Sequence, residues 1–399
     1  MEHIASKWRA MSVGNNWEGL LDPLNNDLRR YIIHYGERAE AAGAAFISEV
    51  KSKNVGLPRY PKTNLFSKIG LEQGNPFKYT VKKYIYASTS EITENTPMGA
   101  AGNSNWIGFV AVSTDQGTHV LGRRDILISW RGTIRHAEEA IDLKTLLIPA
   151  PTIFGSENND AKIHHGWYSY YTHAEPGSTY NSTSSREQVL EAISRLIEEY
   201  KEEIVSITVT GHSMGGALAI LNATDIVFNG FNKPTTTGGK VCPVIAIVFG
   251  CPRLGNQGFS DLFSGLKNLH VLRVRNSKDI VPDLPKHDLL GHKYIHVGNE
   301  FPIDTTTSPY LKSHDSNHAA LHNLDIYLHG VAGPKVVDGK NELEVDRDIA
   351  WVNKQTDLLK DEYNIVANWW VKENKSMVQM DDGKWVLKDP EIAGEDDYI

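Results

Sequence analysis

Short, continuous apolar runs recur along the chain from residue 106 onward. They cover residues 106–114 (WIGFVAVST), 125–130 (DILISW), 204–211 (IVSITVTG), 243–250 (PVIAIVFG) and 270–275 (HVLRVR). Runs of this length, rich in β-branched residues, are typical of strands that are buried on both faces of a parallel sheet. The pattern therefore predicts an α/β fold with a mostly parallel central sheet.

Helical periodicity separates these runs. Between the second and third run, residues 186–203 place apolar side chains on one face, and Ser185 with Gln188 is expected to form a capping box at the start. Residues 27–50 show the same period and are expected to pack across the sheet. Strand, helix and strand in succession predict right-handed crossovers, with helices flanking the sheet.

The overall composition narrows the class of protein. The chain has 40% hydrophobic residues and a net charge of -8, with 49 acidic and 41 basic side chains, so it carries no electrostatic footprint for nucleic acid. Its two cysteines, Cys242 and Cys251, flank a predicted strand that is too long to bring their Cα atoms within disulfide reach. Both are expected to be core thiols of a reducing compartment.

The amino-terminal segment bears on location. Residues 1–21 carry charges where a signal peptide needs a continuous apolar stretch, and they lack the Arg- and Ser-rich character of a transit peptide. No uncharged apolar run reaches the length of about 18 residues that a membrane-spanning helix needs. The sequence predicts a cytoplasmic protein whose contact with a membrane or lipid surface is peripheral.

The motif G-H-S-M-G at 211–215 lies between an apolar run and an apolar helical segment. A nucleophilic serine on a tight strand-to-helix turn needs glycine neighbours, because the backbone is strained and the substrate must approach closely. The following helix directs free N–H groups toward developing negative charge, so the N–H of Met214 is expected to be an oxyanion donor. We predict that Ser213 is the nucleophile. His212 adjoins it in sequence and points elsewhere, so it is not the base.

A serine hydroxyl needs a histidine to accept its proton and a carboxylate to orient that histidine. Asp279 follows the run at 270–275, where the carboxyl end of a strand is the usual place for an active site of an α/β sheet. Asp283 is the alternative, although a surface turn explains it as well. His322 opens an apolar helix and is the favoured base. The other downstream candidates are His287, His292, His296, His314, His318 and His329.

The segment after the run at 125–130 offers a second oxyanion donor. Arg131 and Gly132 lead to Thr133, whose N–H is the candidate donor with its hydroxyl as an auxiliary, and an ordinary glycine turn is the alternative. Residues 134–149 then set apolar positions among charges, in the pattern of a mobile lid over an acyl channel or of a plain core helix. The apolar positions are Ala137, Ile141, Leu147 and Ile148.

Five segments together resemble the fungal-type class 3 lipases: ISWRGT, IHHGWYSYY, TGHSMGGALA, FGCPRLGN and VRNSKDIVPDLP. This resemblance covers about residues 105–330. The N-terminal WRAMSVGNNWEGLLDPLNNDLRRYIIHYGE and the C-terminal VANWWVKENKSMVQMDDGKW are similar to the plant class II phospholipase A1 enzymes, so the likeness spans nearly the whole chain.

The resemblance implies a triad of Ser213, Asp279 and His322 on an α/β-hydrolase fold. It also implies an oxyanion hole that includes Thr133 and Met214, and hydrolysis of the sn-1 fatty acyl ester of glycerophospholipids without a cofactor or metal. Most family members have Leu after the nucleophile. Met214 departs from this pattern, but only its backbone N–H acts, so no loss is expected.

The domain organisation expected from these features is one α/β-hydrolase domain over residues 1–399. It comprises an N-terminal helical arm at 1–60, a catalytic core at 105–330 and a charged C-terminal appendage at 331–399. Two other functions stay open. One is a neutral lipase for mono- or diacylglycerols, because an apolar channel selects the acyl chain more than the head group. The other is a lipase-like signalling scaffold without turnover, which an intact triad argues against.

Overall fold

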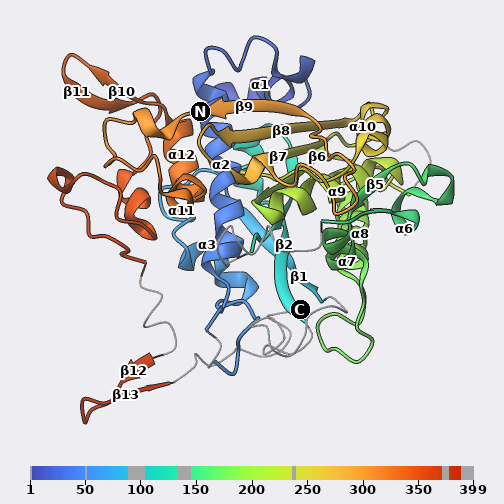
Figure 1. The fold of residues 1–399 in the computed structure, drawn as a ribbon, viewed down its shortest axis with the longest axis horizontal. Helices are drawn as coiled ribbons and strands as arrows, with labels where there is room; N and C mark the ends of the chain where they lie inside the picture. Colours follow the sequence, from blue (N-terminus) through green and yellow to red (C-terminus); the bar gives the residue numbers. More distant parts are fainter. Residues whose placement is uncertain are drawn as a thin grey trace.

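A seven-stranded sheet forms the centre of the computed structural model, which describes residues 2–49, 52–88, 104–133, 145–235, 240–370 and 377–387. The strand order is β1-β2-β3-β6-β7-β8-β9, with β9 and β8 at the top of Figure 1 and β1 at the bottom. β1–β2 and β2–β3 are antiparallel, and every later neighbouring pair is parallel. The strands are β1 (Tyr79–Ala87), β2 (Asn105–Ser113), β3 (Arg124–Trp130), β6 (Val205–His212), β7 (Val244–Phe249), β8 (Leu269–Asn276) and β9 (Asn299–Ile303).

The predicted mostly parallel sheet is confirmed, and each of the five apolar runs corresponds to one of its strands. The pattern did not single out β1 or β9. β1 carries adjacent lysines and β9 contains a proline, so neither reads as a continuous apolar run. Helices cover both faces of this sheet, as expected for crossover connections.

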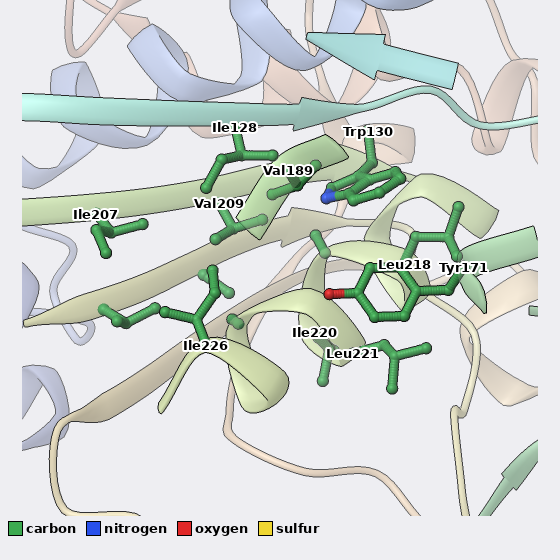
Figure 2. Packing of buried hydrophobic residues seen from close by; sticks show 14 of the residues in the cluster. Ile128, Trp130, Tyr171, Val189, Ile207, Val209, Leu218, Ile220, Leu221 and Ile226 are labelled. Carbon is green, nitrogen blue, oxygen red and sulfur yellow. The ribbon is translucent and has the colours of Figure 1, made fainter. Parts of the chain in front are cut away.

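One hydrophobic core lies between the sheet and α7 (His165–Thr172), α8 (Ser185–Glu199) and α9 (Met214–Phe228). Figure 2 shows Ile128 and Trp130 of β3 and Val209 of β6 gathered with Leu218 and Ile226 of α9. Each fully buried aliphatic side chain contributes about 1.5–3 kcal/mol relative to exposure, so this packing fixes where α9 begins.

A second core covers the opposite face, where α1 (Glu2–Ser12), α2 (Asn26–Ala44) and α12 (Leu324–Ala332) lie (Figure 1). α2 packs across the sheet as predicted, but it ends at Ala44 and not at residue 50. The other helices are α3 (Leu65–Lys68), α4 (Asp115–Leu121), α6 (Pro151–Phe154), α10 (Gln257–Ser264) and α11 (His318–Leu321). Within the described ranges, no helix is long and apolar enough to cross a bilayer.

The capping box of α8 lies one residue earlier than predicted. Ser184 accepts a hydrogen bond from the N–H of Glu187, and the Glu187 carboxylate accepts one from the N–H of Ser184. Gln188 is buried and bonds the backbone of Tyr86 in β1. The prediction of Ser185 with Gln188 was therefore wrong, because tertiary contacts recruit those two side chains.

Beyond α12, the described residues 333–370 and 377–387 form small hairpins and 3-10 turns. β10 (Pro334–Val337) pairs with β11 (Lys340–Leu343), and β12 (Met377–Gln379) pairs with β13 (Trp385–Leu387). The 3-10 turn η6 (Ile349–Lys354) packs on α12. The division of the chain into arm, core and appendage stays a prediction.

Of the suspected lid, Ala137 and Ile141 lie outside the described residues. Leu147 and Ile148 belong to β4 (Leu147–Pro149), which pairs with β5 (Lys162–His164).

Candidate active site

Ser213 occupies the turn between β6 and α9. Its φ of 58° and ψ of -130° lie in a region that costs a residue with a side chain about 1–3 kcal/mol. The turn is closed by glycines on either side. A Cβ on Gly211 would lie 2.2 Å from the Gly215 oxygen, and one on Gly215 would lie 2.3 Å from the Trp130 oxygen. The strained turn at the serine is therefore possible only because two neighbouring positions are occupied by glycine, where any side chain would clash.

Asp279 lies on the loop that leaves the carboxyl end of β8, and it is almost fully buried. Its Oδ2 accepts hydrogen bonds from His322 Nδ1 at 2.6 Å and from the Tyr327 hydroxyl at 2.5 Å. Its Oδ1 accepts one from the N–H of Val281 at 2.9 Å. The structure thus brings Asp279 and His322 together and gives the carboxylate three donors.

His322 lies between α11 and α12, with its side chain 12% exposed. Its Nδ1 is bonded to Asp279, while its Nε2 is buried and has no hydrogen-bond partner within the described part of the chain. An imidazole held in this way carries its proton on Nδ1 and presents an unprotonated Nε2, as a general base requires.

The segment Phe249–Gly250 connects the serine with this pair. The N–H of Ser213 donates to the Phe249 oxygen at 3.0 Å. Gly250 has a φ of 53°, and a Cβ there would lie 2.9 Å from Cε1 of His322 and 3.2 Å from Oδ2 of Asp279. Both parts of the site therefore pack against two successive residues of one strand end.

His212 supports His322 from the other side. Its Nε2 lies 2.7 Å from the backbone oxygen of His322, and the two rings are 4.5 Å apart. Burial, together with the neighbouring His322, lowers the pKa of His212 well below 6.5, so the ring is neutral and its Nε2–H donates. The ring of His212 is thus engaged with the His322 backbone oxygen, so it is not the general base. Its hydrogen bond instead holds the backbone that carries His322 in place.

Tyr327 is held in its donor form. Burial and the nearby Asp279 carboxylate raise the pKa of Tyr327 well above 10, so its hydroxyl keeps its proton and donates to Asp279.

The two predicted oxyanion donors lie beside Ser213. Met214 is the first residue of α9, and the Ser213 side chain makes no capping bond to this helix. Gly132 packs against the serine, since a Cβ there would lie 2.7 Å from the His212 oxygen and 3.3 Å from Cβ of Ser213. Thr133 follows it directly. The segment 132–133 therefore packs beside the serine turn, and the role of the Thr133 and Met214 N–H groups as oxyanion donors stays a prediction.

The alternative candidates have other roles. Asp283 pairs with Arg275 at 2.9 Å and with Arg253 at 3.4 Å near the surface. His314 bonds Lys312 and Thr305, and His318 is exposed at the start of α11. Of the other downstream candidates, His292 bonds the Asp288 carboxylate, His296 bonds the backbone oxygen of Pro282 and His329 bonds the Ser308 hydroxyl.

Sequence reasoning missed the supporting roles of His212, Tyr327 and Gly250. His212 lies inside the serine motif, at a position that the motif leaves free. Tyr327 lies on the helix that follows His322, about one and a half turns further along the chain. Its position points to a role beside the acid only once His322 is known to be the base. Gly250 has no local signal, because its need for a missing side chain arises from tertiary contacts.

A serine on a strand-to-helix turn, followed in the chain by an acid and a histidine on later loops of a mostly parallel sheet, defines the α/β-hydrolase class. The family model described as "Lipase (class 3)" matches residues 127–289. The chain is 47% identical to Phospholipase A1-IIgamma of Arabidopsis thaliana, over 99% of this chain and 95% of that protein. It is 46% identical to Phospholipase A1-II 1 of Oryza sativa subsp. indica, over 98% of this chain and 97% of that protein.

The chain therefore belongs to the class 3 lipase family, among the plant phospholipase A1-II proteins, and the predicted family is confirmed. Among solved structures, it is similar to a lipase of Yarrowia lipolytica, LIP2, with 17% identity and a TM-score of 0.46 over 70% of this chain and 81% of that one.

Proposed function

We propose that this chain is a serine carboxylic-ester hydrolase that cleaves the sn-1 fatty acyl ester of glycerophospholipids. The observation that carries the proposal is the 2.6 Å bond from His322 Nδ1 to Asp279, with an unpartnered Nε2 within the described chain. This pair packs against Gly250, and the preceding residue, Phe249, accepts the N–H of the strained Ser213. The names of the plant relatives, phospholipase A1-II, favour a phospholipid substrate.

The proposed reaction has two halves. His322 Nε2 takes the proton of the Ser213 hydroxyl while Oγ attacks the ester carbonyl, and the N–H groups of Thr133 and Met214 stabilise the oxyanion. The intermediate collapses, and His322 returns the proton to the departing glycerol oxygen. Water then transfers a proton to His322 and attacks the acyl carbonyl; as the Oγ–acyl bond breaks, His322 returns that proton to Ser213 Oγ, which releases the fatty acid and restores the free enzyme. Asp279 keeps the Nδ1–H tautomer of His322 throughout.

We further propose a cytoplasmic location and peripheral contact with a lipid surface. The two buried, free cysteines, Cys242 and Cys251, support a reducing compartment.

Replacement of the nucleophile tests the chemistry. We expect Ser213→Ala to lower kcat on phosphatidylcholine by a factor of about 10⁴ or more, because no other hydroxyl occupies the turn. Labelling by a fluorophosphonate probe should disappear with it. Ser156→Ala, on an exposed turn, is the matched control and should keep both. Unchanged turnover in a folded Ser213→Ala protein would exclude the proposal.

The position of cleavage tests the substrate. Phosphatidylcholine and diacylglycerol, each labelled at sn-1 or sn-2, should be compared at equal surface density. We expect release of the sn-1 label and a preference for the phospholipid. Faster release from diacylglycerol would instead identify a neutral-lipid lipase, and no release from any ester would support a scaffold role.

A further inference from the structure

The connection between η4 (Val281–Asp283) and β9 carries two adjacent, strongly exposed leucines. Leu289 is 77% exposed and Leu290 is 71% exposed, and among the residues whose burial the structure describes no other adjacent pair of large apolar residues is exposed in this way. Single exposed apolar side chains are ordinary on a protein surface. Two in succession at the tip of a turn expose apolar area that packing within the chain does not explain.

The turn that presents these leucines is internally braced. Oδ1 of the buried Asp288 accepts hydrogen bonds from the N–H groups of Leu290 at 2.9 Å and His292 at 2.8 Å. Its Oδ2 accepts one from His292 Nδ1 at 2.8 Å. The backbone N–H of Asp288 donates to the His292 oxygen at 2.8 Å, and Gly291 supplies the positive φ of 85° that the turn needs. The leucines therefore project from a structured turn.

The charges around the leucines differ in sign from the chain as a whole. Lys286 and Lys293 flank the turn and are exposed, as are His287 and His292, while the acid of the turn, Asp288, is buried and bonded. The chain carries a net charge of -8. An apolar tip with flanking lysines on an otherwise acidic protein matches a bilayer surface that contains anionic lipid.

The turn is also linked to the candidate active site. Asp279 and the turn belong to the same longer connection, from β8 to β9, and Ile280, directly after that acid, is another exposed apolar residue. Insertion of the turn into a lipid surface would thus bring the loop that carries Asp279 close to that surface.

We infer that residues 286–293 are an interfacial anchor, in which Leu289 and Leu290 insert into the lipid surface and Lys286 and Lys293 contact anionic head groups. The anchor extends the proposed function. The vesicle-binding test does not depend on that function, whereas the hydrolysis test does.

Binding is tested without turnover in the full-length Ser213→Ala protein, by sedimentation with vesicles of phosphatidylcholine alone or with phosphatidylglycerol added. We expect Leu289→Ser with Leu290→Ser to lower the partition coefficient about tenfold or more, because both side chains lose their transfer into hydrocarbon. Lys286→Gln with Lys293→Gln should lower it by about tenfold only on vesicles that contain phosphatidylglycerol. The matched control is Val336→Ser with Val366→Ser. These valines are 60% and 73% exposed elsewhere on the chain, and their replacement should change the partition coefficient on neither kind of vesicle.

Catalysis is then measured with Ser213 intact. The leucine pair should slow hydrolysis of vesicle phospholipid about tenfold while kcat/KM for a soluble short-chain ester stays within about twofold. Partitioning equal to that of the control, or an equal loss on the soluble ester, would overturn the anchor. Should the double variant not fold, Leu290→Ser alone and the lysine pair decide the question. Lack of ester hydrolysis by the unchanged protein would contradict the proposed function instead. The anchor would then be tested by vesicle binding alone.

Discussion

Two buried aspartates, at opposite ends of the sheet, have nearly the same number of hydrogen-bond donors and different chemistry. Asp125 lies near the amino end of β3 and is fully buried. Its carboxylate accepts hydrogen bonds from the hydroxyls of Tyr35, Tyr79, Ser206 and Thr208, at 2.7–2.9 Å. Asp279, beyond the carboxyl end of β8, accepts from one hydroxyl, one backbone N–H and one imidazole.

The difference between the two clusters lies in what the donors can do. Burial and the Asp125 carboxylate raise the pKa of Tyr35 and Tyr79 well above 10, so those hydroxyls keep their protons at neutral pH. The Asp125 cluster therefore joins α2 to the sheet and exchanges no proton. An imidazole can gain and lose a proton near neutral pH, so its place beside Asp279 makes that cluster fit for proton transfer. Burial and hydrogen bonding alone do not distinguish a functional carboxylate from a structural one.

Replacement of each acid by its amide should separate the two roles most strongly. We expect Asp279→Asn to lower kcat by a factor of about 10³–10⁴, because the His322 tautomer is no longer fixed. Its free energy of unfolding should change by only about 1 kcal/mol, since functional polar groups are seldom optimised for stability. Asp125→Asn should instead cost about 3–5 kcal/mol, because it leaves the buried Arg123 without its carboxylate partner, with kcat of the folded fraction unchanged.

Urea unfolding and ester turnover of both variants check this contrast. Equal losses of activity in the two amide variants would mean that the clusters do not differ as described.

The tyrosines of the two clusters should show a smaller effect of the same kind. Tyr327→Phe removes one donor to Asp279 and should lower kcat about tenfold with KM unchanged, because a hydrogen bond to a charged group contributes about 1.5–3 kcal/mol. Tyr79→Phe removes a donor to Asp125 and should cost about 1–3 kcal/mol of unfolding free energy while kcat stays as it was. A rise of KM in Tyr327→Phe would assign it to substrate binding and contradict its role in positioning Asp279.

The sequence was sufficient for the parts of this picture that depend on local pattern. The strand runs, the serine motif and the acid after the fifth apolar run could be located because each is defined by its immediate neighbours. The capping box shows the limit of this reasoning. Ser184 with Glu187 and Ser185 with Gln188 satisfy the same spacing, and only the burial of Gln188 against β1 decides between them.

The remaining features depend on which segments meet in space. Tyr35 of α2 and Tyr79 of β1 both bond Asp125, and the positions of these three residues in the sequence do not predict the contact. Tyr327 and Gly250 acquire their roles in the same way, from contacts with Asp279 and His322. The Leu289–Leu290 pair could be seen in the sequence, but its exposure could not, because apolar pairs occur equally in cores.

The histidine next to the Asp125 cluster offers the finest test of the comparison. Burial, with Arg38 and Arg123 nearby, lowers the pKa of His34 well below 6.5, so the folded protein binds no proton there. The unfolded chain does bind one below its ordinary pKa of about 6.5, so this group destabilises the fold as the pH falls, by up to about 2 kcal/mol between pH 7 and pH 5. His34→Gln should remove that part of the pH dependence, as measured by urea unfolding at several pH values. His329→Gln is the matched comparison, because burial lowers the pKa of His329 to about 3 at a site apart from both clusters. The changes in pH dependence caused by the two substitutions should be additive. An unchanged pH dependence in His34→Gln would mean that the folded state accommodates the charged ring, and the Asp125 cluster would then not be closed to protons.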